Sequence, residues 1–504
     1  MPDLFHSILY GFSVSLEPAN LLACFLGVLI GTLIGVLPGI GSAATLSLLF
    51  PFTYTLSPTA SIVMMAGIYY GAMYGGSTTS ILMNIPGEAA SVVTCLDGHA
   101  MALQGRAGPA LGIAAFGSFI AGTLGVVGIM LLAPPLASIA LRFGPPEILS
   151  LLLLGVIIVT YLSSGSKLKA AAMAVLGLLL STAGLDPLSG VPRFTFGSIT
   201  LLDGVPLVPV IMGLFGVAEV LQHIAKNEKA EILQTRIRGL LPTQQDWRES
   251  AGPIVRGSLL GFFLGILPGI GAIIPSFISY GIERRLAKHP EQFGKGAIAG
   301  VAGPESANNA ATAGSMILLL TLGIPPNVVM AVLLGAFIVH GVQPGPLLIH
   351  DHPEIFWGVI ASMYVGNAML LVLNLPLIGV WVQLLRVRYG TLFPTILLLC
   401  VIGAYSEAGN IWGVVIMLVF GLVGYIMKRW QYDPVPLVLA LVLGRMAEEA
   451  VRQSLLLSRG NIGIFFTRPI SAALLLMAAV LIPLPVLWPR RQTPDVLLAE
   501  VDPK

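Results

Sequence analysis

The stretch GVLIGTLIGVLPGIG at residues 27–41 returns as GSLLGFFLGILPGIG at residues 257–271, 230 residues further along the chain. In both copies glycine recurs at every fourth position, which places a smooth groove on one helix face and lets another helix approach closely. The Pro-Gly pair that follows removes a backbone donor and frees φ, so it predicts a broken helix. A match of this length indicates two homologous halves.

A second pair of motifs repeats downstream of the first pair. Gly76-Ser77 and Ile85-Pro86 in the first half correspond to Gly314-Ser315 and Ile324-Pro325 in the second, with one residue inserted between them. Helix breaks at matching positions of two halves point to the binding site of a transporter, although a structural kink alone would leave the same pattern. The predicted helix breaks are Pro38, Gly39, Pro86, Gly87, Pro268, Gly269 and Pro325.

The composition shows that these motifs belong to a polytopic membrane protein. Apolar residues make up 56% of the 504 residues, and Asp, Glu, Lys and Arg only 10%, whereas a soluble chain carries about 25% charged residues. These values exclude soluble, disordered and fibrous chains, and three widely spaced cysteines exclude a disulfide scaffold and a metal cluster. The net charge of +2 leaves no basic surface for nucleic acid.

We expect an all-α fold with about 10–12 spans in two homologous, inverted repeats, with re-entrant or broken helices where apolar segments are too short to cross. Basic residues in the central polar loop place that loop in the cytoplasm. The predicted units are an N-terminal interfacial helix (1–17), a first transmembrane repeat (18–221), a polar cytoplasmic loop (222–250), a second transmembrane repeat (251–444) and a C-terminal segment with the last span (445–504).

Small polar side chains cluster next to the predicted breaks, in otherwise apolar sequence. The N-terminus of a half-helix presents unpaired N–H groups and suits an anion, while hydroxyls and amides add neutral donors for a carboxylate. Such side chains also bond to their own helix, so a packing role stays open for each one alone. The candidate substrate-binding residues are Ser77, Thr78, Thr79, Asn84, Ser306, Asn308, Asn309, Thr312 and Ser315.

Two acidic residues, Glu88 and Glu305, each follow a predicted proline-containing turn. An acid within a membrane is a candidate cation ligand or proton carrier, and we assign ion or proton coupling to both as a hypothesis. The alternative for each is a carboxylate that stabilises a helix N-terminus.

Several catalytic motifs are missing from the sequence. It contains no Gly-x4-Gly-Lys-Ser/Thr phosphate loop, no His-Glu-x-x-His and no Gly-x-Ser-x-Gly, which are typical of nucleotide hydrolases, metalloproteases and serine hydrolases. We therefore do not expect an enzyme. No cofactor or metal is expected either, with Na⁺ as a candidate coupling ion only.

The motifs resemble the large membrane subunit of the tripartite tricarboxylate transporter family over nearly the whole chain. Pro326 departs from this pattern, because the family has glycine after Gly-Ile-Pro. The matching stretches are GVLPGIGSAATLSLLFPFTY (35–54), the block 69–118 that contains GGSTTSILMNIPGE, PESANNAATAGSMILLLTLGIPP (304–326), HGVQPGPLL (340–348) and the C-terminal segment 441–471.

This resemblance implies a secondary active transporter in the bacterial inner membrane that takes up a small di- or tricarboxylate, such as citrate. It further implies a small membrane subunit, a periplasmic solute-binding protein that delivers the substrate, and an Na⁺ or H⁺ gradient that drives uptake. The main alternative is a passive channel or uniporter for small organic anions. A lipid-modifying membrane enzyme and a structural scaffold are weaker alternatives.

Overall fold

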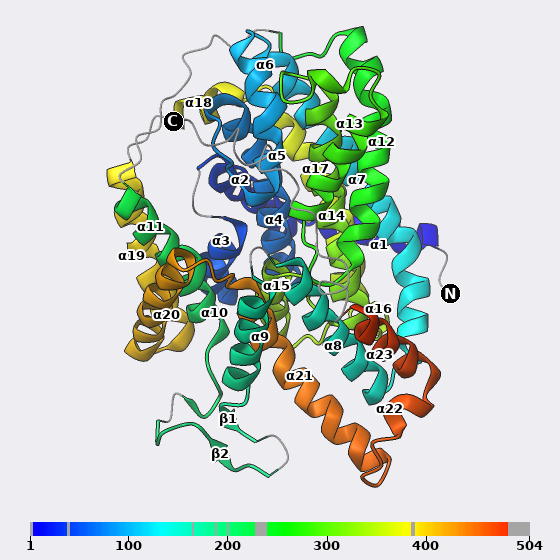
Figure 1. The fold of residues 1–504 in the computed structure, drawn as a ribbon, viewed down its shortest axis with the longest axis vertical. Helices are drawn as coiled ribbons and strands as arrows, with labels where there is room; N and C mark the ends of the chain where they lie inside the picture. The colour runs from blue at the N-terminus through cyan, green and yellow to red at the C-terminus, as the bar shows by residue number, and fades with distance from the viewer. Residues whose placement is uncertain are drawn as a thin grey trace.

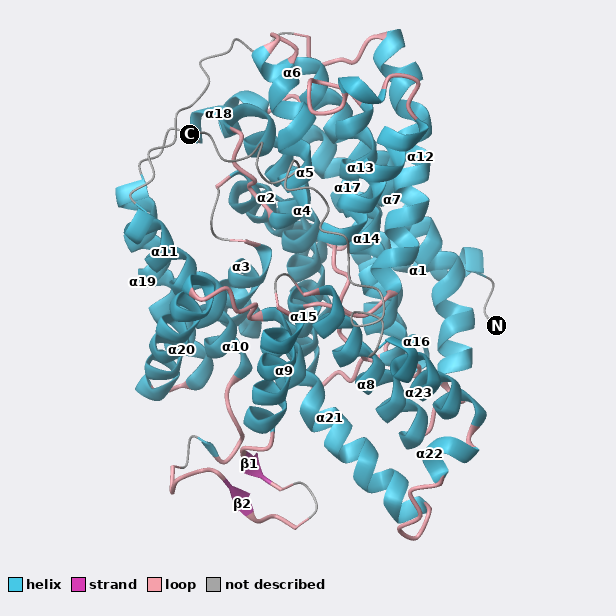
Figure 2. Ribbon diagram, in the orientation of Figure 1, coloured by secondary structure: helices cyan, strands magenta, loops and turns pink. Residues whose placement is uncertain are grey.

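The computed structural model describes residues 4–37, 41–163, 166–186, 189–198, 201–226, 239–384 and 389–481. Helices fill nearly the whole fold in Figure 2, beside one short antiparallel pair of strands, β1 (Gly184–Leu185) and β2 (Pro192–Arg193). The prediction of an all-α polytopic membrane protein is confirmed.

The helices follow one another along the chain as Figure 1 shows. Up to residue 226 they are α1 (Leu4–Ser15), α2 (Pro18–Val36), α3 (Ser42–Leu49), η1 (Phe50–Thr55), α4 (Pro58–Met83), η2 (Ala89–Ser91), α5 (Val92–Thr94), η3 (Cys95–His99), α6 (Ala100–Leu103), α7 (Ala107–Ala140), α8 (Pro145–Leu162), α9 (Lys167–Ser181), α10 (Leu207–Ile211), η5 (Met212–Val217) and α11 (Ala218–Lys226). After residue 239 they are α12 (Gln244–Ile266), α13 (Ile273–Leu286), η6 (Pro290–Gln292), α14 (Ala299–Leu322), α15 (Val328–Val339), α16 (Leu348–Asp351), α17 (Pro353–Asn374), α18 (Ile378–Leu384), α19 (Tyr389–Ala408), α20 (Ile411–Arg429), α21 (Val435–Leu457), α22 (Ile464–Thr467) and α23 (Pro469–Leu481).

The repeated glycines hold two helix pairs in close contact, α2 on α4 and α12 on α14. A Cβ atom added at Gly31 would lie 2.4 Å from the carbonyl oxygen of Ile68, and one added at Gly261 would lie 2.1 Å from that of Ala307. The glycines one turn before and after make the same kind of contact in each pair. Corresponding glycines of the two halves therefore pack against carbonyls of corresponding helices, as expected for small residues at a membrane helix interface.

The central helices of both halves end in the same backbone conformation. Asn84 follows α4 with φ of 56°, and Gly323 follows α14 with φ of 69°. Both residues stand directly before an Ile-Pro dipeptide, and a left-handed residue followed by proline is a common end of a helix. α4 and α14 lie in the middle of the bundle in Figure 1, and nearly every residue of both is buried.

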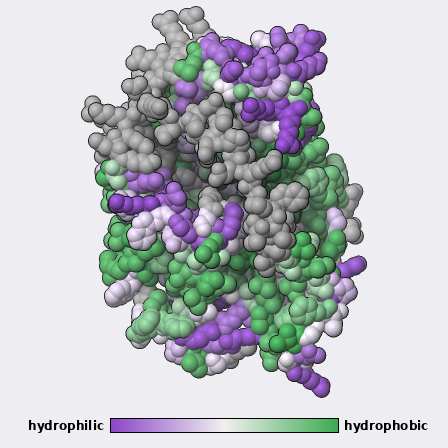
Figure 3. Space-filling model, viewed as in Figure 1, coloured by the Kyte–Doolittle hydropathy of each residue, from purple (hydrophilic) through white to green (hydrophobic). Residues whose placement is uncertain are grey.

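Four helices of the described residues are long and apolar enough to cross a membrane, namely Pro18–Val36, Ala107–Ala140, Pro353–Asn374 and Ile411–Arg429. Shorter apolar helices accompany them, as the interrupted apolar segments predict. Figure 3 shows hydrophobic residues over much of the lower part of one face, interrupted by hydrophilic residues at its lower edge, and further hydrophilic residues at the top, around the outer ends of α12 and α13.

The predicted units meet the observed helices at slightly different boundaries. α11 and α12 extend into the predicted 222–250 loop from either side, and residues 227–238 between them lie outside the described part of the chain. The predicted break residues Pro38 and Gly39 also lie outside the described residues, between the end of α2 and the start of α3.

Candidate functional site

A cavity of about 610 Å³ lies where four loops of the bundle meet. Its wall contains residues 41–44 and 86–90 from the first half of the chain, and residues 269–274 and 327–329 from the second. These segments are where the repeated Pro-Gly-Ile-Gly and Ile-Pro motifs end, so corresponding loops of the two halves line one cavity. Its volume falls in the range of small-molecule sites, roughly 300–1,000 Å³.

Three helices begin at the wall of this cavity. α3 starts after Gly41, α13 after Ala272 and α15 after Asn327, and all three of these residues line the cavity. The first N–H groups of a helix have no partner within the helix and carry a partial positive charge. The cavity therefore has several anion-binding ends around one space.

The N-terminus of α3 already has a carboxylate from the protein. Glu88 accepts a hydrogen bond from the backbone N–H of Ser42 at 3.0 Å and another from the Ser42 hydroxyl at 3.3 Å. This geometry is that of an acid that stabilises a helix N-terminus, the alternative that the sequence left open for Glu88. Glu88 also lines the cavity.

The second half places a neutral residue where the first half has Glu88. Ile85-Pro86-Gly87-Glu88 corresponds to Ile324-Pro325-Pro326-Asn327. The side-chain carbonyl of Asn327 accepts from the N–H of Met330 at 2.9 Å. Its side-chain amide donates to the Tyr69 hydroxyl at 3.3 Å and to the Ser315 hydroxyl at 3.2 Å. Among the described residues, no carboxylate bonds to the N-terminus of α13, which corresponds to that of α3.

Acidic side chains lie elsewhere around the cavity. Glu219 forms an ion pair with Lys428. Asp433 accepts from the Ser163 hydroxyl at 2.7 Å and from the N–H of Val435 at 3.0 Å. The wall made by residues 269–274 and 327–329 contains only neutral side chains, so this side of the cavity is the one that suits an anion.

The predicted site residues separate into two groups. Those that line the cavity are Pro86, Gly87, Glu88 and Gly269. Pro268 lies beside them in the turn between α12 and α13, and Pro325 in the loop after α14. Asn84 is exposed at the end of α4.

The predicted polar residues on α4 and α14 lie in the helix packing behind the cavity, and all are buried. The Thr79 hydroxyl donates to the carbonyl of Val36 at 2.5 Å, and the Ser315 hydroxyl donates to the helix's own backbone at 2.9 Å. Their absence from the wall was not foreseeable, because a sequence does not show which way a polar side chain of a buried helix points. The residues in this group are Ser77, Thr78, Thr79, Ser306, Asn308, Asn309, Thr312 and Ser315.

Glu305 lies inside α14 and not after a proline turn, so that part of the prediction is wrong. Pro304 occupies the second turn of the helix, where proline removes a single backbone hydrogen bond and the surrounding helices hold the turn in place. The Glu305 side chain has no exposed surface. It accepts from the Ser77 hydroxyl at 2.6 Å, from the Asn308 amide at 3.1 Å and from the Thr94 hydroxyl.

Asp97 is an anchoring residue that the sequence reasoning missed. It is fully buried in η3 and accepts from the backbone N–H groups of Gly294, Gly296 and Ala297 at 2.8–2.9 Å, and from the Tyr280 hydroxyl at 2.9 Å. A carboxylate from the first half of the chain therefore holds the loop that leads into α14 in the second half. An isolated acid in the apolar stretch VVTCLDG (92–98) is the signal that could have found it.

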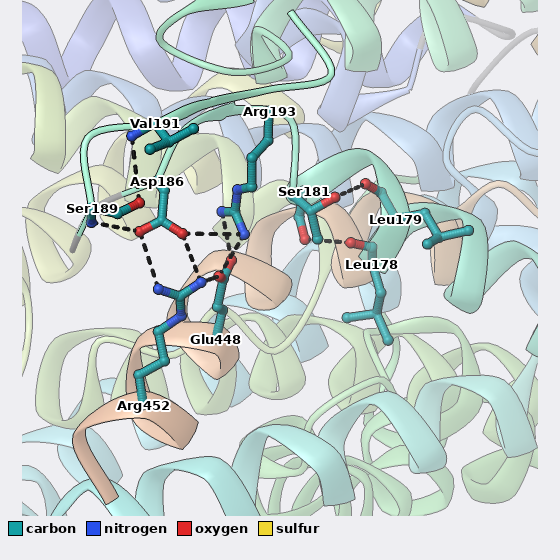
Figure 4. A network of polar contacts seen from close by, with 10 residues as sticks. Leu178, Leu179, Ser181, Asp186, Ser189, Val191, Arg193, Glu448 and Arg452 are labelled. Atoms are coloured by element: carbon teal, nitrogen blue, oxygen red, sulfur yellow. Dashed lines mark hydrogen bonds and ion pairs between the residues drawn. The ribbon is translucent and has the colours of Figure 1, made fainter. Parts of the chain in front are cut away.

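A charged cluster ties the β1–β2 hairpin to α21. Figure 4 shows the guanidinium groups of Arg193 and Arg452 converging on Asp186 and Glu448. Arg452 lies 2.7 Å from Asp186 and 2.6 Å from Glu448, and Arg193 lies 2.8 Å from Glu448. The hydrogen bonds from Arg193 lower the pKa of Glu448, so this carboxyl stays ionised at neutral pH. The cluster shares no residue with the cavity wall.

Comparison with known proteins gives a consistent family assignment. The family described as "Tripartite tricarboxylate transporter TctA family" matches residues 21–439. An uncharacterized 52.8 kDa protein of Agrobacterium vitis, from the TAR-I ttuC' 3' region, is 48% identical over 502 residues, which is 100% of both chains. A protein of the same organism from the TAR-II ttuC' 3' region is 48% identical over 242 residues, 48% of this chain and 100% of its own length. No solved structure matches.

The family match covers most of the chain and both motif pairs that line the cavity. Members of this family are inner-membrane transport components that work with a small membrane subunit and a periplasmic binding protein. The chain belongs to the tripartite tricarboxylate transporter TctA family and is the membrane component of such a transporter.

Proposed function

We propose that this protein is a secondary active transporter that takes up a small di- or tricarboxylate, such as citrate, through the cavity between the corresponding loops of its two halves. A periplasmic solute-binding protein would deliver the substrate, and an Na⁺ or H⁺ gradient would drive uptake. The observation that carries this proposal is the convergence of three helix N-termini on one cavity of about 610 Å³.

The two halves differ at the point where a substrate carboxylate would bind. Glu88 fills the N-terminus of α3 with a carboxylate of the protein, whereas the α13 side offers only neutral groups. A substrate carboxylate at α13 would therefore take the position that Glu88 takes at α3. Backbone N–H groups hold a carboxylate without a fixed positive charge, which leaves binding weak enough for release.

The two halves give a physical basis for alternating access. If they are inverted repeats, as we propose, rocking one half against the other would expose the cavity to each side of the membrane in turn. The loops 41–44 and 86–90 would then move relative to 269–274 and 327–329. A passive channel would not need the two halves to move relative to each other.

The experiment is uptake of labelled citrate and a panel of other small carboxylates into cells that express this chain with its small membrane subunit and binding protein. Concentrative uptake that requires all three components supports the proposal. Passive equilibration through this chain alone would show a channel. Varying Na⁺ at fixed pH, and pH at fixed Na⁺, identifies the driving ion.

Single substitutions then test the cavity itself. Replacing Asn327 with alanine removes a polar group of the wall and the cap of α15. Asn410 caps α20 in the same way, with its side-chain carbonyl 2.9 Å from the N–H of Trp412, and does not line the cavity. The proposal predicts that the Asn327→Ala variant loses uptake and that the matched Asn410→Ala variant retains it.

A further inference from the structure

Glu305 is a carboxyl group buried in the middle of the bundle without a basic partner. Its side chain is 0% exposed, and no Lys, Arg or His among the described residues forms an ion pair with it. An isolated buried carboxylate is costly, so such a group needs a proton, a cation or strong hydrogen bonds. Its three partners, Ser77, Thr94 and Asn308, are all neutral.

The partners of Glu305 suit a group that binds and releases a proton. Serine and threonine hydroxyls can donate or accept, so Ser77 and Thr94 can donate to an ionised Glu305 and accept from a protonated one. The Ser77 oxygen lies 2.6 Å from the carboxylate oxygen, a direct hydrogen bond that can persist when Glu305 takes up a proton. The geometry therefore fits proton binding.

A polar face of α14 leads from Glu305 toward the cavity. Asn308, Asn309 and Thr312 follow Glu305 at intervals that place them on one helix face, and Thr312 lies about 10 Å along the helix axis from Glu305. The side-chain amide of Asn309 donates to the side-chain carbonyl of Asn308 at 2.6 Å, and the side-chain amide of Asn308 donates to the Glu305 carboxylate. These are residues that the sequence marked as polar in an apolar helix.

Small voids lie beside these polar residues. One of about 10 Å³ is lined by Tyr74, Asn309 and Thr312, and that volume is about what one water molecule needs. At the cavity wall, the Asn327 amide donates to the Ser315 hydroxyl at 3.2 Å, and Ser315 stands three residues after Thr312 on the same face of α14. Polar groups thus continue from the cavity, through Asn327, Ser315 and Thr312, to the amides next to Glu305.

A second void of about 10 Å³ lies beside Ser77, the residue that donates to Glu305. Asn374 lines this void, is only 5% exposed, and has a side-chain carbonyl oxygen without a partner in the described part of the protein. A buried acceptor at a water-sized void is the usual environment of an ordered water. Both voids include Tyr74 in their lining.

The other titratable groups on the elements around Glu305 are either paired or neutral. Cys95 of η3 is a buried free thiol that donates to the backbone carbonyl of Ser91 at 3.9 Å. Asp97 of η3 is held by three N–H groups and by Tyr280 of α13. Glu283 of α13 forms an ion pair with Arg256 of α12, and α4 contributes Tyr74 to the nearby voids. Glu305 is therefore the carboxyl of this region without a charged or backbone partner.

We propose that Glu305 binds a proton during the transport cycle and exchanges it with the cavity along the polar face of α14, which makes H⁺ the ion coupled to carboxylate uptake. In the proton-binding step a hydronium ion in the void beside Ser77 gives a proton to the Ser77 oxygen and becomes water, while the original Ser77 hydroxyl proton passes to the carboxylate oxygen of Glu305. The new carboxyl O–H donates to Ser77 or Thr94. The proposal deepens the transport function proposed above and rests on it.

The test compares exchange with accumulation for the complete transporter in proteoliposomes. Glu305→Gln keeps the size of the side chain but does not exchange a proton. We expect this variant to exchange labelled for unlabelled substrate and to lose accumulation driven by a pH gradient, while the exposed Glu291→Gln variant behaves as wild type. Accumulation by Glu305→Gln with the pH response of wild type would overturn the proposal.

Two further measurements keep the outcome clear. If Glu305→Gln loses exchange as well, the Glu305→Asp variant decides between the outcomes, because aspartate can still bind and release a proton. Accumulation by Glu305→Asp with a shifted pH dependence supports the proposal. An inactive Glu305→Asp variant overturns it. Infrared difference spectra of the purified protein at acidic and alkaline pH need no substrate. A carboxyl band that is present in wild type and absent in Glu305→Gln is expected even if carboxylates are not transported, and identical spectra would contradict a titrating Glu305.

Discussion

The asymmetry between Glu88 and Asn327 predicts the effect of one substitution. Asn327→Glu would give the second half the carboxylate that Glu88 gives the first, placed to bond to the N-terminus of α13 as Glu88 bonds to Ser42 of α3 at 3.0 Å. It would occupy the N–H groups that we assign to the substrate. If the substrate carboxylate accepts two hydrogen bonds there, at about 1.5–3 kcal/mol each for a charged acceptor, about 3–6 kcal/mol of binding is lost.

That loss corresponds to an apparent affinity weaker by roughly 100-fold or more, and repulsion between two carboxylates adds to it. The assay is initial-rate uptake of labelled carboxylate against substrate concentration, normalised to the amount of transporter in the membrane. Asn410→Glu is the matched control, since Asn410 also caps a helix. Unchanged apparent affinity in Asn327→Glu, at equal protein amount, would refute the assignment of α13 as the carboxylate site.

Three other substitutions test the architecture that holds the cavity. Gly261→Val places its Cβ 2.1 Å from a carbonyl oxygen of α14 and should lower the stability of the protein by about 1–3 kcal/mol or more. Gly281→Ala is the control, because a Cβ there has nothing within 4 Å, and it should leave stability unchanged. Thermal unfolding of the purified protein measures both. Asp97→Ala leaves three backbone N–H groups without their acceptor and should lower thermal stability, at about 1–3 kcal/mol for each unpaired buried group, and an unchanged melting temperature would contradict the anchoring role. Arg452→Ala removes ion pairs that hold the β1–β2 hairpin, so trypsin should cleave after Arg193 faster than in wild type, and equal rates would show that the cluster does not restrain the hairpin.

The sequence predicted the fold class from its composition, and it predicted close helix contacts because glycine spacing acts locally. Gly31 and Gly261 needed only their spacing to predict close helix contacts, and the structure shows the contacts at 2.4 Å and 2.1 Å for an added Cβ. The Ile-Pro dipeptides likewise mark the ends of α4 and α14. These effects depend on a few neighbouring residues and are readable without tertiary information.

The lining of the cavity was predicted only in part, because it depends on which way side chains point and on which loops meet. Ser77 and Asn308 stand in polar runs that look like binding sites, but the structure turns both toward Glu305. Asn327 contributes to the wall and was not among the predicted binding residues, although aligning the two halves places it opposite Glu88. Asp97 acts across 200 residues on Ala297, a pairing that no local pattern encodes.

Cysteine protection by substrate tests the central claim, that the cavity between corresponding loops binds the carboxylate. Ile273 lines the cavity and is 42% exposed, so the Ile273→Cys variant should react with a small maleimide, while the natural Cys24, Cys95 and Cys400 are buried. We predict that a carboxylate that the complex takes up slows this reaction, and leaves unchanged the reaction of a cysteine at Gly281, which does not line the cavity. Equal reaction rates at Ile273→Cys with and without a transported carboxylate would contradict the account.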